Sequence, residues 1–85
     1  MYNYKKGAIN MYYFFEDKKE VTNALFTALK TTIEGVDIKE MRYDKLENNR
    51  ETVTIVYVDE HRKLINVSCD SGIALMKDVL RAIAL

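Results

Sequence analysis

Apolar and polar residues alternate most regularly in the second half of the chain. Val53, Ile55 and Tyr57 are apolar and lie two residues apart. This period of two predicts a strand over Glu51–Val58 whose buried face carries these three residues. A polar turn over Asp59–Arg62 and a second alternating run over Lys63–Cys69 complete a predicted hairpin. The remaining run has the three-to-four spacing of a helix, which is expected over Asp70–Ala84 with Asp70 or Ser71 as its cap. Its buried stripe is predicted to consist of Ile73, Met76, Val79, Leu80 and Ile83, with Leu75 alongside.

An earlier helix is predicted from a capping signal. Asp17 and Glu20 have the spacing of a capping box, and the helix is expected to run to about Glu34, where Gly35 would supply a left-handed end. Its predicted buried face comprises Val21, Ala24, Leu25, Ala28, Leu29 and Thr32.

The first strand of the expected sheet is less regular than the other two. It is predicted at Val36–Tyr43, where the apolar residues change parity, so a β-bulge is expected near Lys39–Glu40. In the loop that follows, Asn48 and Asn49 are expected to adopt positive φ.

These elements predict an α+β fold: a three-stranded antiparallel meander with two helices on one face, in the order α-β-β-β-α. The strands pair an aliphatic face with a Thr/Asn/Ser-rich face, so one side of the sheet is expected to be covered and the other open to water. Residues 11–85 are expected to form a single domain, preceded by a variable lead-in at residues 1–10. The aromatic run Met11–Phe15 would either add a short strand to a sheet edge or pack beneath the first helix.

Composition excludes several classes of function. Thirteen basic and thirteen acidic residues cancel, so no general attraction to nucleic acid or to an anionic membrane is indicated. No apolar run approaches the length of a membrane span, and no membrane partner is expected. A single cysteine, Cys69, excludes an intrachain disulfide and favours a reducing, cytoplasmic location.

The candidate chemical groups indicate no enzyme. The one histidine, His61, is expected to be a plain turn residue, and Cys69 shares the inward parity of Ile65 and Val67, which predicts a packed, inert thiol. Metal-ligand spacings of Cys and His and Gly-rich phosphate loops are absent from the sequence. We therefore expect no catalytic site, no cofactor, no metal and no small-molecule substrate.

Charge is concentrated in the middle of the chain, where residues 34–60 carry eight acidic and four basic residues. This surplus fits either a solvated sheet edge or an acidic docking surface for a basic partner protein. The predicted partner-binding residues are acids of this segment and two aromatic residues: Glu40, Asp44, Glu47, Asp59, Glu60, Tyr12 and Tyr13.

The segment Thr52–Ile83 places a strand, a polar turn, a strand and an acidic cap before the helical sequence ALMKDVLRAI. This arrangement resembles small phage and mobile-element inhibitor proteins, particularly anti-CRISPR proteins that block RNA-guided nucleases. The resemblance implies a non-enzymatic protein that inhibits a nucleic-acid-handling protein by binding it. Two alternatives remain: a homo-oligomeric structural protein, with a homodimer among the expected assemblies, and a nucleic-acid-binding module. The latter would resemble double-stranded-RNA-binding domains in topology and would use Arg42, Arg50, Arg62 and Lys63.

Overall fold

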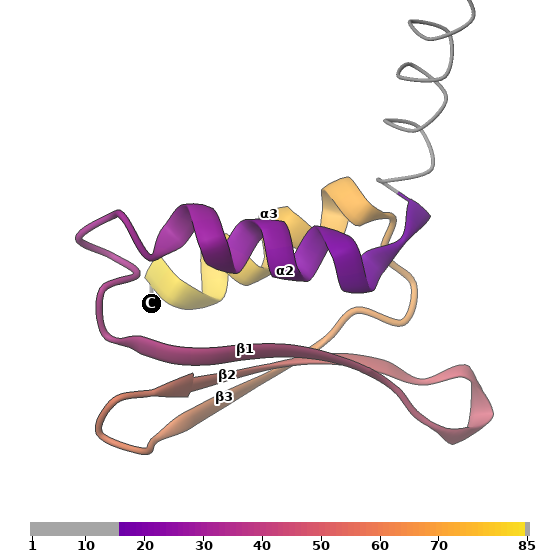
Figure 1. Cartoon of the computed structure of the whole chain (residues 1–85). Coiled ribbons are helices and arrows are strands. Elements are labelled where there is room, and N and C mark those ends of the chain that lie inside the picture. The colour runs from indigo at the N-terminus through magenta and orange to yellow at the C-terminus, as the bar shows by residue number, and fades with distance from the viewer. Residues whose placement is uncertain (1–15, 85) are drawn as a thin grey trace, which may run out of the picture.

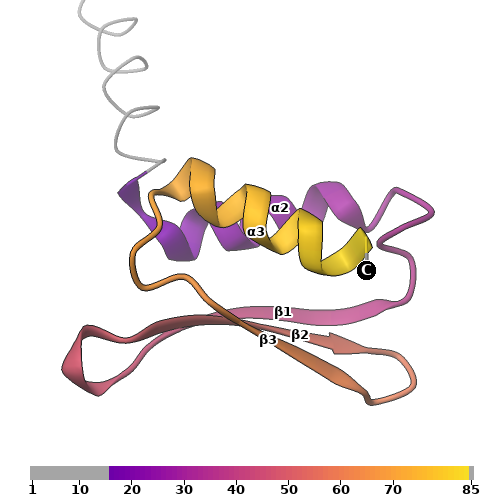
Figure 2. The same cartoon turned by 180° about the vertical axis from the view of Figure 1, so that it is seen from behind.

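The computed structural model describes residues 16–84 as two helices over a three-stranded sheet. The strands lie in the order β1-β2-β3 and both pairs are antiparallel. Both helices lie side by side on one face of the sheet (Figures 1 and 2), which confirms the predicted α+β fold. The lead-in and the alternative strand at 11–15 lie outside the described residues. In chain order the elements are α2 (Lys18–Leu29), β1 (Ile38–Lys45), the 3-10 helix η1 (Glu47–Asn49), β2 (Glu51–Tyr57), β3 (Arg62–Asn66) and α3 (Gly72–Ala84).

Helix α2 begins as predicted but ends earlier. The Asp17 carboxylate accepts a hydrogen bond from the Glu20 amide (3.2 Å), which satisfies one of the free N–H groups of the first turn. The helix stops at Leu29 rather than Glu34, where the Thr32 hydroxyl donates to the Leu29 carbonyl (2.7 Å) in the turn that follows. Such side-chain bonds give the backbone an alternative to the helical ladder.

The role expected of Gly35 is wrong. Its φ is not positive, so it supplies no left-handed helix end. A Cβ at this position would lie 2.2 Å from the Leu29 carbonyl oxygen, so glycine is required here because the backbone passes directly over the end of α2.

The irregularity of the first strand is a β-bulge, as predicted. Ile38 pairs with Tyr57 while Glu40 pairs with Val56, so Lys39 is the extra residue. Ile38 and Met41 consequently both face the helices and are buried. Positive φ is also confirmed in the next loop, where φ is 62° at Asn48 and 60° at Asn49.

The core lies between the helices and the covered face of the sheet. Leu29, Ile55, Val67 and Val79 are all buried within one cluster. The remaining buried members of that cluster come from α2, the strands and α3: Val21, Ile38, Met41, Val53, Tyr57 and Leu75.

The predicted helix faces are confirmed only in part: Val21, Leu29 and Val79 are buried as expected, but both helices are rotated somewhat relative to the prediction. In α2, Ala24 and Ala28 are exposed, whereas Thr22 is fully buried. In α3, Leu75 is the central buried residue, while Ile73 is 50% and Leu80 44% exposed. The physical reason is that each helix packs against the other helix as well as the sheet, so its buried face points between the two neighbours.

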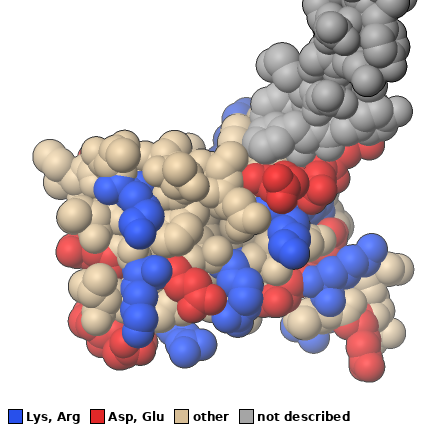
Figure 3. Space-filling view, in the orientation of Figure 1, with Lys and Arg blue, Asp and Glu red and all other residues tan. Residues whose placement is uncertain are grey.

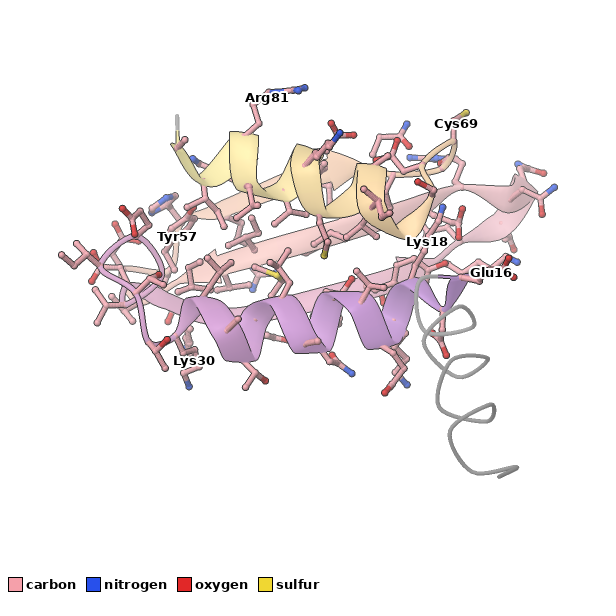
Figure 4. The ribbon with its side chains drawn as sticks, turned by 90° about the horizontal axis from the view of Figure 1, so that it is seen from above. Glu16, Lys18, Lys30, Tyr57, Cys69 and Arg81 are labelled. Atoms are coloured by element: carbon pink, nitrogen blue, oxygen red, sulfur yellow. The ribbon has the colours of Figure 1, made fainter. Side chains whose placement is uncertain are left out.

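The prediction for Cys69 is also wrong. Strand β3 ends at Asn66, whose side chain accepts a hydrogen bond from the Ser68 amide (2.9 Å), and the Asp70 amide then donates to the Val67 carbonyl (3.1 Å). The chain therefore turns before Cys69, strand parity no longer applies, and the thiol is exposed (Figure 4). Ser71 caps α3 by accepting from the Ala74 amide (3.1 Å).

Among residues 16–84, no element lies on the second face of the sheet, which we call the uncovered face. It consists of three rows across the strands, Glu40–Val56–Arg62, Arg42–Thr54–Leu64 and Asp44–Thr52–Asn66. The threonines were expected to face water, yet Thr52 and Thr54 are each only 6% exposed. They are nearly buried because the longer side chains of the two edge strands flank the central strand.

Candidate functional site

A groove of about 370 Å³ opens at the end of the domain where the α2–β1 connection meets the β2–β3 turn. Figure 4 places Tyr57 at this end, beside that connection. We call this the acidic groove, and its lining consists of Glu34, Asp37, Tyr57, Val58, Asp59 and His61.

The backbone holds the two sides of the groove together. The Val58 amide donates to the Asp37 carbonyl (2.8 Å), which ties the connection before β1 to the end of β2. In the turn, the Tyr57 amide donates to the His61 carbonyl (2.9 Å) and the Glu60 amide donates to the Tyr57 carbonyl (2.8 Å). Glu60 itself has a φ of 76°, a conformation that costs energy for any residue with a Cβ.

An aromatic stack forms one wall of the groove. The rings of Tyr57 and His61 lie parallel, 4.1 Å apart and inclined by 7°. The Lys63 ammonium lies 5.6 Å from the Tyr57 ring centroid and donates to the Ala82 carbonyl (2.5 Å). His61 therefore does more than was expected of a plain turn residue, since it shields one face of a core tyrosine.

The carboxylates of this end are arranged to stay ionised. Hydrogen bonds from the His61 amide and ring hold the pKa of Asp59 below its usual value. The Lys39 ammonium, 2.7 Å from the Glu60 carboxylate, likewise lowers the pKa of Glu60. Glu34 and Asp37 form no ion pair with any residue in the range 16–84. Their negative charge is therefore available to a ligand.

Apolar side chains border the same end of the domain. Ile33 is 88% exposed, Val36 62% and Val58 59%, and all three belong to the two segments that form the groove. Large apolar residues exposed this close together are typical of interaction surfaces. In the face drawn in Figure 3, this end carries acidic, basic and uncharged atoms side by side. The surface could bind a partner that presents both positive charge and an apolar contact.

The structure distributes the sequence-predicted residues over three places. Asp59 lines the acidic groove together with Glu34 and Asp37, which were not among the predicted residues. Glu60 lies in the same turn but outside the lining, where it pairs with Lys39. Glu40 and Asp44 lie on the uncovered face, where both pair with Arg42 at 3.2 and 2.8 Å. Glu47 lies in η1, between β1 and β2. The last two predicted residues, Tyr12 and Tyr13, lie outside the described part of the chain.

The basic residues named for nucleic-acid binding do not converge. Arg42 is paired with two carboxylates, and Lys63 reaches across the covered side to the Ala82 carbonyl. Arg50 follows η1, whereas Arg62 begins β3 and lies on the uncovered face at the opposite edge from Arg42.

A second, more open depression of about 420 Å³ lies at the start of α2. Here Lys18 donates to the Glu51 carboxylate (2.8 Å) and to the Val67 carbonyl (2.7 Å), and the Tyr43 hydroxyl donates to the other Glu51 oxygen. Burial and the adjoining Glu51 carboxylate raise the pKa of Tyr43 to about 12. Burial opposes ionisation of Glu51, but the hydrogen bonds from Lys18 and Tyr43 outweigh it and lower its pKa. These groups form hydrogen bonds with one another and join α2, β1, β2 and the residue after β3. We call the cluster of Lys18, Tyr43, Glu51 and the Val67 carbonyl the clamp.

In the described part of the chain, no group of three or more His, Cys, Asp or Glu residues is placed to hold a metal ion. None of the helices there has the length and apolar character needed to cross a membrane. Comparison with known proteins gave no match to a family model, to a curated protein or to a solved structure.

Proposed function

We propose that this domain is a non-enzymatic binding protein that docks a basic segment of a partner protein in the acidic groove. The observation that carries the proposal is the coincidence of unpaired carboxylates, a stacked aromatic wall and an exposed apolar border at one end of the fold. A lysine or arginine from the partner would contact Glu34, Asp37 and Asp59, and its aliphatic stem would lie along Val58.

The most concrete form of this proposal is inhibition of a nucleic-acid-handling protein. Such proteins need basic surfaces to bind phosphate backbones, and an inhibitor that occupies such a surface competes with the nucleic acid. The sequence resemblance to anti-CRISPR proteins supports the same class of partner. A reducing cytoplasm suits the proposal because the one cysteine is exposed and would remain a free thiol there.

The test uses basic peptides as probes. Fluorescence anisotropy should detect binding of a labelled lysine- and arginine-rich peptide to the full chain, with affinity falling as salt rises. Asp37→Lys should weaken binding at least tenfold, whereas Glu47→Lys, the same charge change in η1, should have a much smaller effect. Equal effects of the two substitutions would show that only net charge matters and would refute the groove.

A functional readout then addresses inhibition. The full chain should slow DNA cleavage by at least one member of a panel of RNA-guided nucleases, and Asp37→Lys should remove this effect while Glu47→Lys retains it. Tight binding of the wild-type chain to bare duplex DNA or RNA would instead favour the nucleic-acid-binding alternative.

A further inference from the structure

The uncovered face of the sheet carries a charge pattern that is complementary to itself. Its first row has Glu40 on one edge strand and Arg62 on the other, with Val56 between them. Its second row has Arg42 opposite Leu64, and Leu64 is 68% exposed. Acid and base thus occupy opposite edges of the first row. Glu40 also lies 3.2 Å from Arg42 of its own chain, but about half of each side chain is exposed, so Glu40 can still contact a second copy.

Symmetry turns this pattern into a specific mode of pairing. A two-fold axis that runs along β2, between two stacked sheets, places β1 of each copy over β3 of the other and keeps each row at the same level. Glu40 then lies over the partner's Arg62, and the stem of Arg42 lies over the partner's Leu64. Asp44 lies over the partner's Asn66, which can donate a hydrogen bond from its side-chain amide.

The other in-plane axis gives the opposite result. A two-fold axis perpendicular to the strands places β1 over β1, so Glu40 would face the partner's Asp44 and Arg42 would face the partner's Arg42. Like charges facing each other across an interface are unfavourable. Electrostatics therefore selects the axis along the strands.

We propose that two copies of this chain pair through their uncovered faces about an axis parallel to β2. This pairing goes beyond the proposed function, because it uses Glu40, Arg62 and Leu64 rather than the lining of the acidic groove. Aligned sheets pack about 10 Å apart and within about 30° of each other. The long side chains of Glu40 and Arg62, on the edge strands in the first row, can together span this distance.

The size of the face sets the expected strength. Three strands spaced about 4.8 Å apart, with five to eight residues rising about 3.3 Å each, give a flat footprint of roughly 300 Å². A standard interface buries about 800 Å² on each partner, so this dimer should be weak, with a Kd in the range of about 10⁻⁴ M. It should be populated only at high protein concentration and should weaken as salt rises.

The test is a charge exchange followed by sedimentation velocity on the full chain, from about 0.05 to 2 mM at low salt. Wild type should shift from monomer towards dimer across this range. Arg62→Glu and Glu40→Arg should each raise the Kd at least tenfold, because each variant places like charges at both copies of the Glu40–Arg62 contact. An equimolar mixture of the two variants should recover wild-type association, because each contact in the mixed dimer joins opposite charges.

Two further variants and one direct measurement complete the design. Leu64→Asp should weaken association, whereas Ile73→Asp, at an apolar residue of α3 that is 50% exposed, should leave it unchanged. In wild type, concentration-dependent NMR shifts should centre on Thr54 and Leu64, and this measurement does not depend on any variant folding.

Three results would overturn the proposal: a chain that stays monomeric at 2 mM, association insensitive to Arg62→Glu, or a mixture that associates no better than either variant alone. Concentration-dependent shifts centred outside the uncovered face would overturn it as well. Binding of basic peptides is measured separately, so the proposed function and this pairing stand or fall independently.

Discussion

Replacing Lys18 with methionine should reveal how much the clamp at the start of α2 contributes to stability. The ammonium group lies 2.8 Å from the Glu51 carboxylate and 2.7 Å from the Val67 carbonyl, and the side chains of Lys18 and Glu51 are only 13% and 16% exposed. Methionine keeps most of the length and apolar contacts of the lysine stem, so the substitution removes the charge and the donors with little loss of packing.

The magnitude follows from burial. Removing one partner of a fully buried ion pair costs about 3–5 kcal/mol, whereas exposed pairs contribute about 0–1 kcal/mol. Since this pair is closer to the buried limit, and the Val67 carbonyl also loses its donor, we expect a loss of about 2–4 kcal/mol. A chain of 85 residues has a total stability of roughly 4–13 kcal/mol, so the effect should be large.

Urea unfolding at pH 7, followed by circular dichroism, measures this loss. Glu51→Gln and the double variant complete a double-mutant cycle, and the double variant should cost less than the two single losses added together, because the neutral glutamine side chain needs no cation. In wild type, the stabilisation from Glu51 should be present above its ordinary pKa of 4.5 and lost as the pH falls through its lowered folded pKa. Lys19→Met, at the exposed neighbouring lysine, is the matched control, and equal losses for Lys18→Met and Lys19→Met would refute the clamp.

Three further substitutions test the core, a half-buried carboxylate and the β2–β3 turn. Leu29→Ala should cost about 2–5 kcal/mol because Leu29 is only 8% exposed within the core, and an unchanged Tm would contradict its placement. Asp70→Asn should raise the Tm at pH 7, since one Asp70 oxygen is buried without a hydrogen-bond partner among the described residues, and burial, with the nearby Asp78 carboxylate, raises its pKa. A carboxyl with a raised pKa stabilises the fold below its ordinary pKa of 3.8 and loses that effect as the pH rises. The Tm values of wild type and Asp70→Asn should therefore converge in acid. Equal Tm values at pH 7 would argue against a destabilising charge at Asp70. Glu60→Gly should raise the Tm by a few degrees relative to Glu60→Ala, because both lose the exposed pair with Lys39 but only glycine relieves the positive φ, and the reverse order would exclude strain at this turn.

The sequence alone determined the elements and their order, because local signals were strong. The alternation from Val53 to Tyr57 predicted β2 and its buried face, and the parity change before Met41 predicted the bulge in β1. The Asp17 cap predicted the start of α2, and the paired asparagines predicted a left-handed turn. Each of these features depends on residues within a few positions of one another, which is the range over which propensity, capping and pleat periodicity act.

Part of the acidic groove was also visible in the sequence, because Asp59, which lines it, belongs to the surplus of acids in residues 34–60. No local pattern joined Asp59 to Asp37, which reaches the groove because its carbonyl accepts from the amide of Val58, a residue far along the chain. Nor could spacing reveal the stack of His61 on Tyr57, which depends on the tight turn that returns His61 over the end of β2.

Tertiary structure alone decided which residues at the margins of each predicted helix face are buried. Ile73 and Leu80 fit an apolar stripe as well as Leu75 does, yet of these three only Leu75 belongs to the core cluster, where it is fully buried. The exposure of Cys69 was likewise decided by structure beyond the strand pattern. The Asn66 side chain accepts a hydrogen bond from the Ser68 amide in a turn that follows β3, so the alternation of the strand does not extend to Cys69 and its thiol is exposed. The periodicity of a helix or strand is a property of its own residues. Which of its sides is buried depends on the positions of the neighbouring elements, and these positions are set only when the whole core packs.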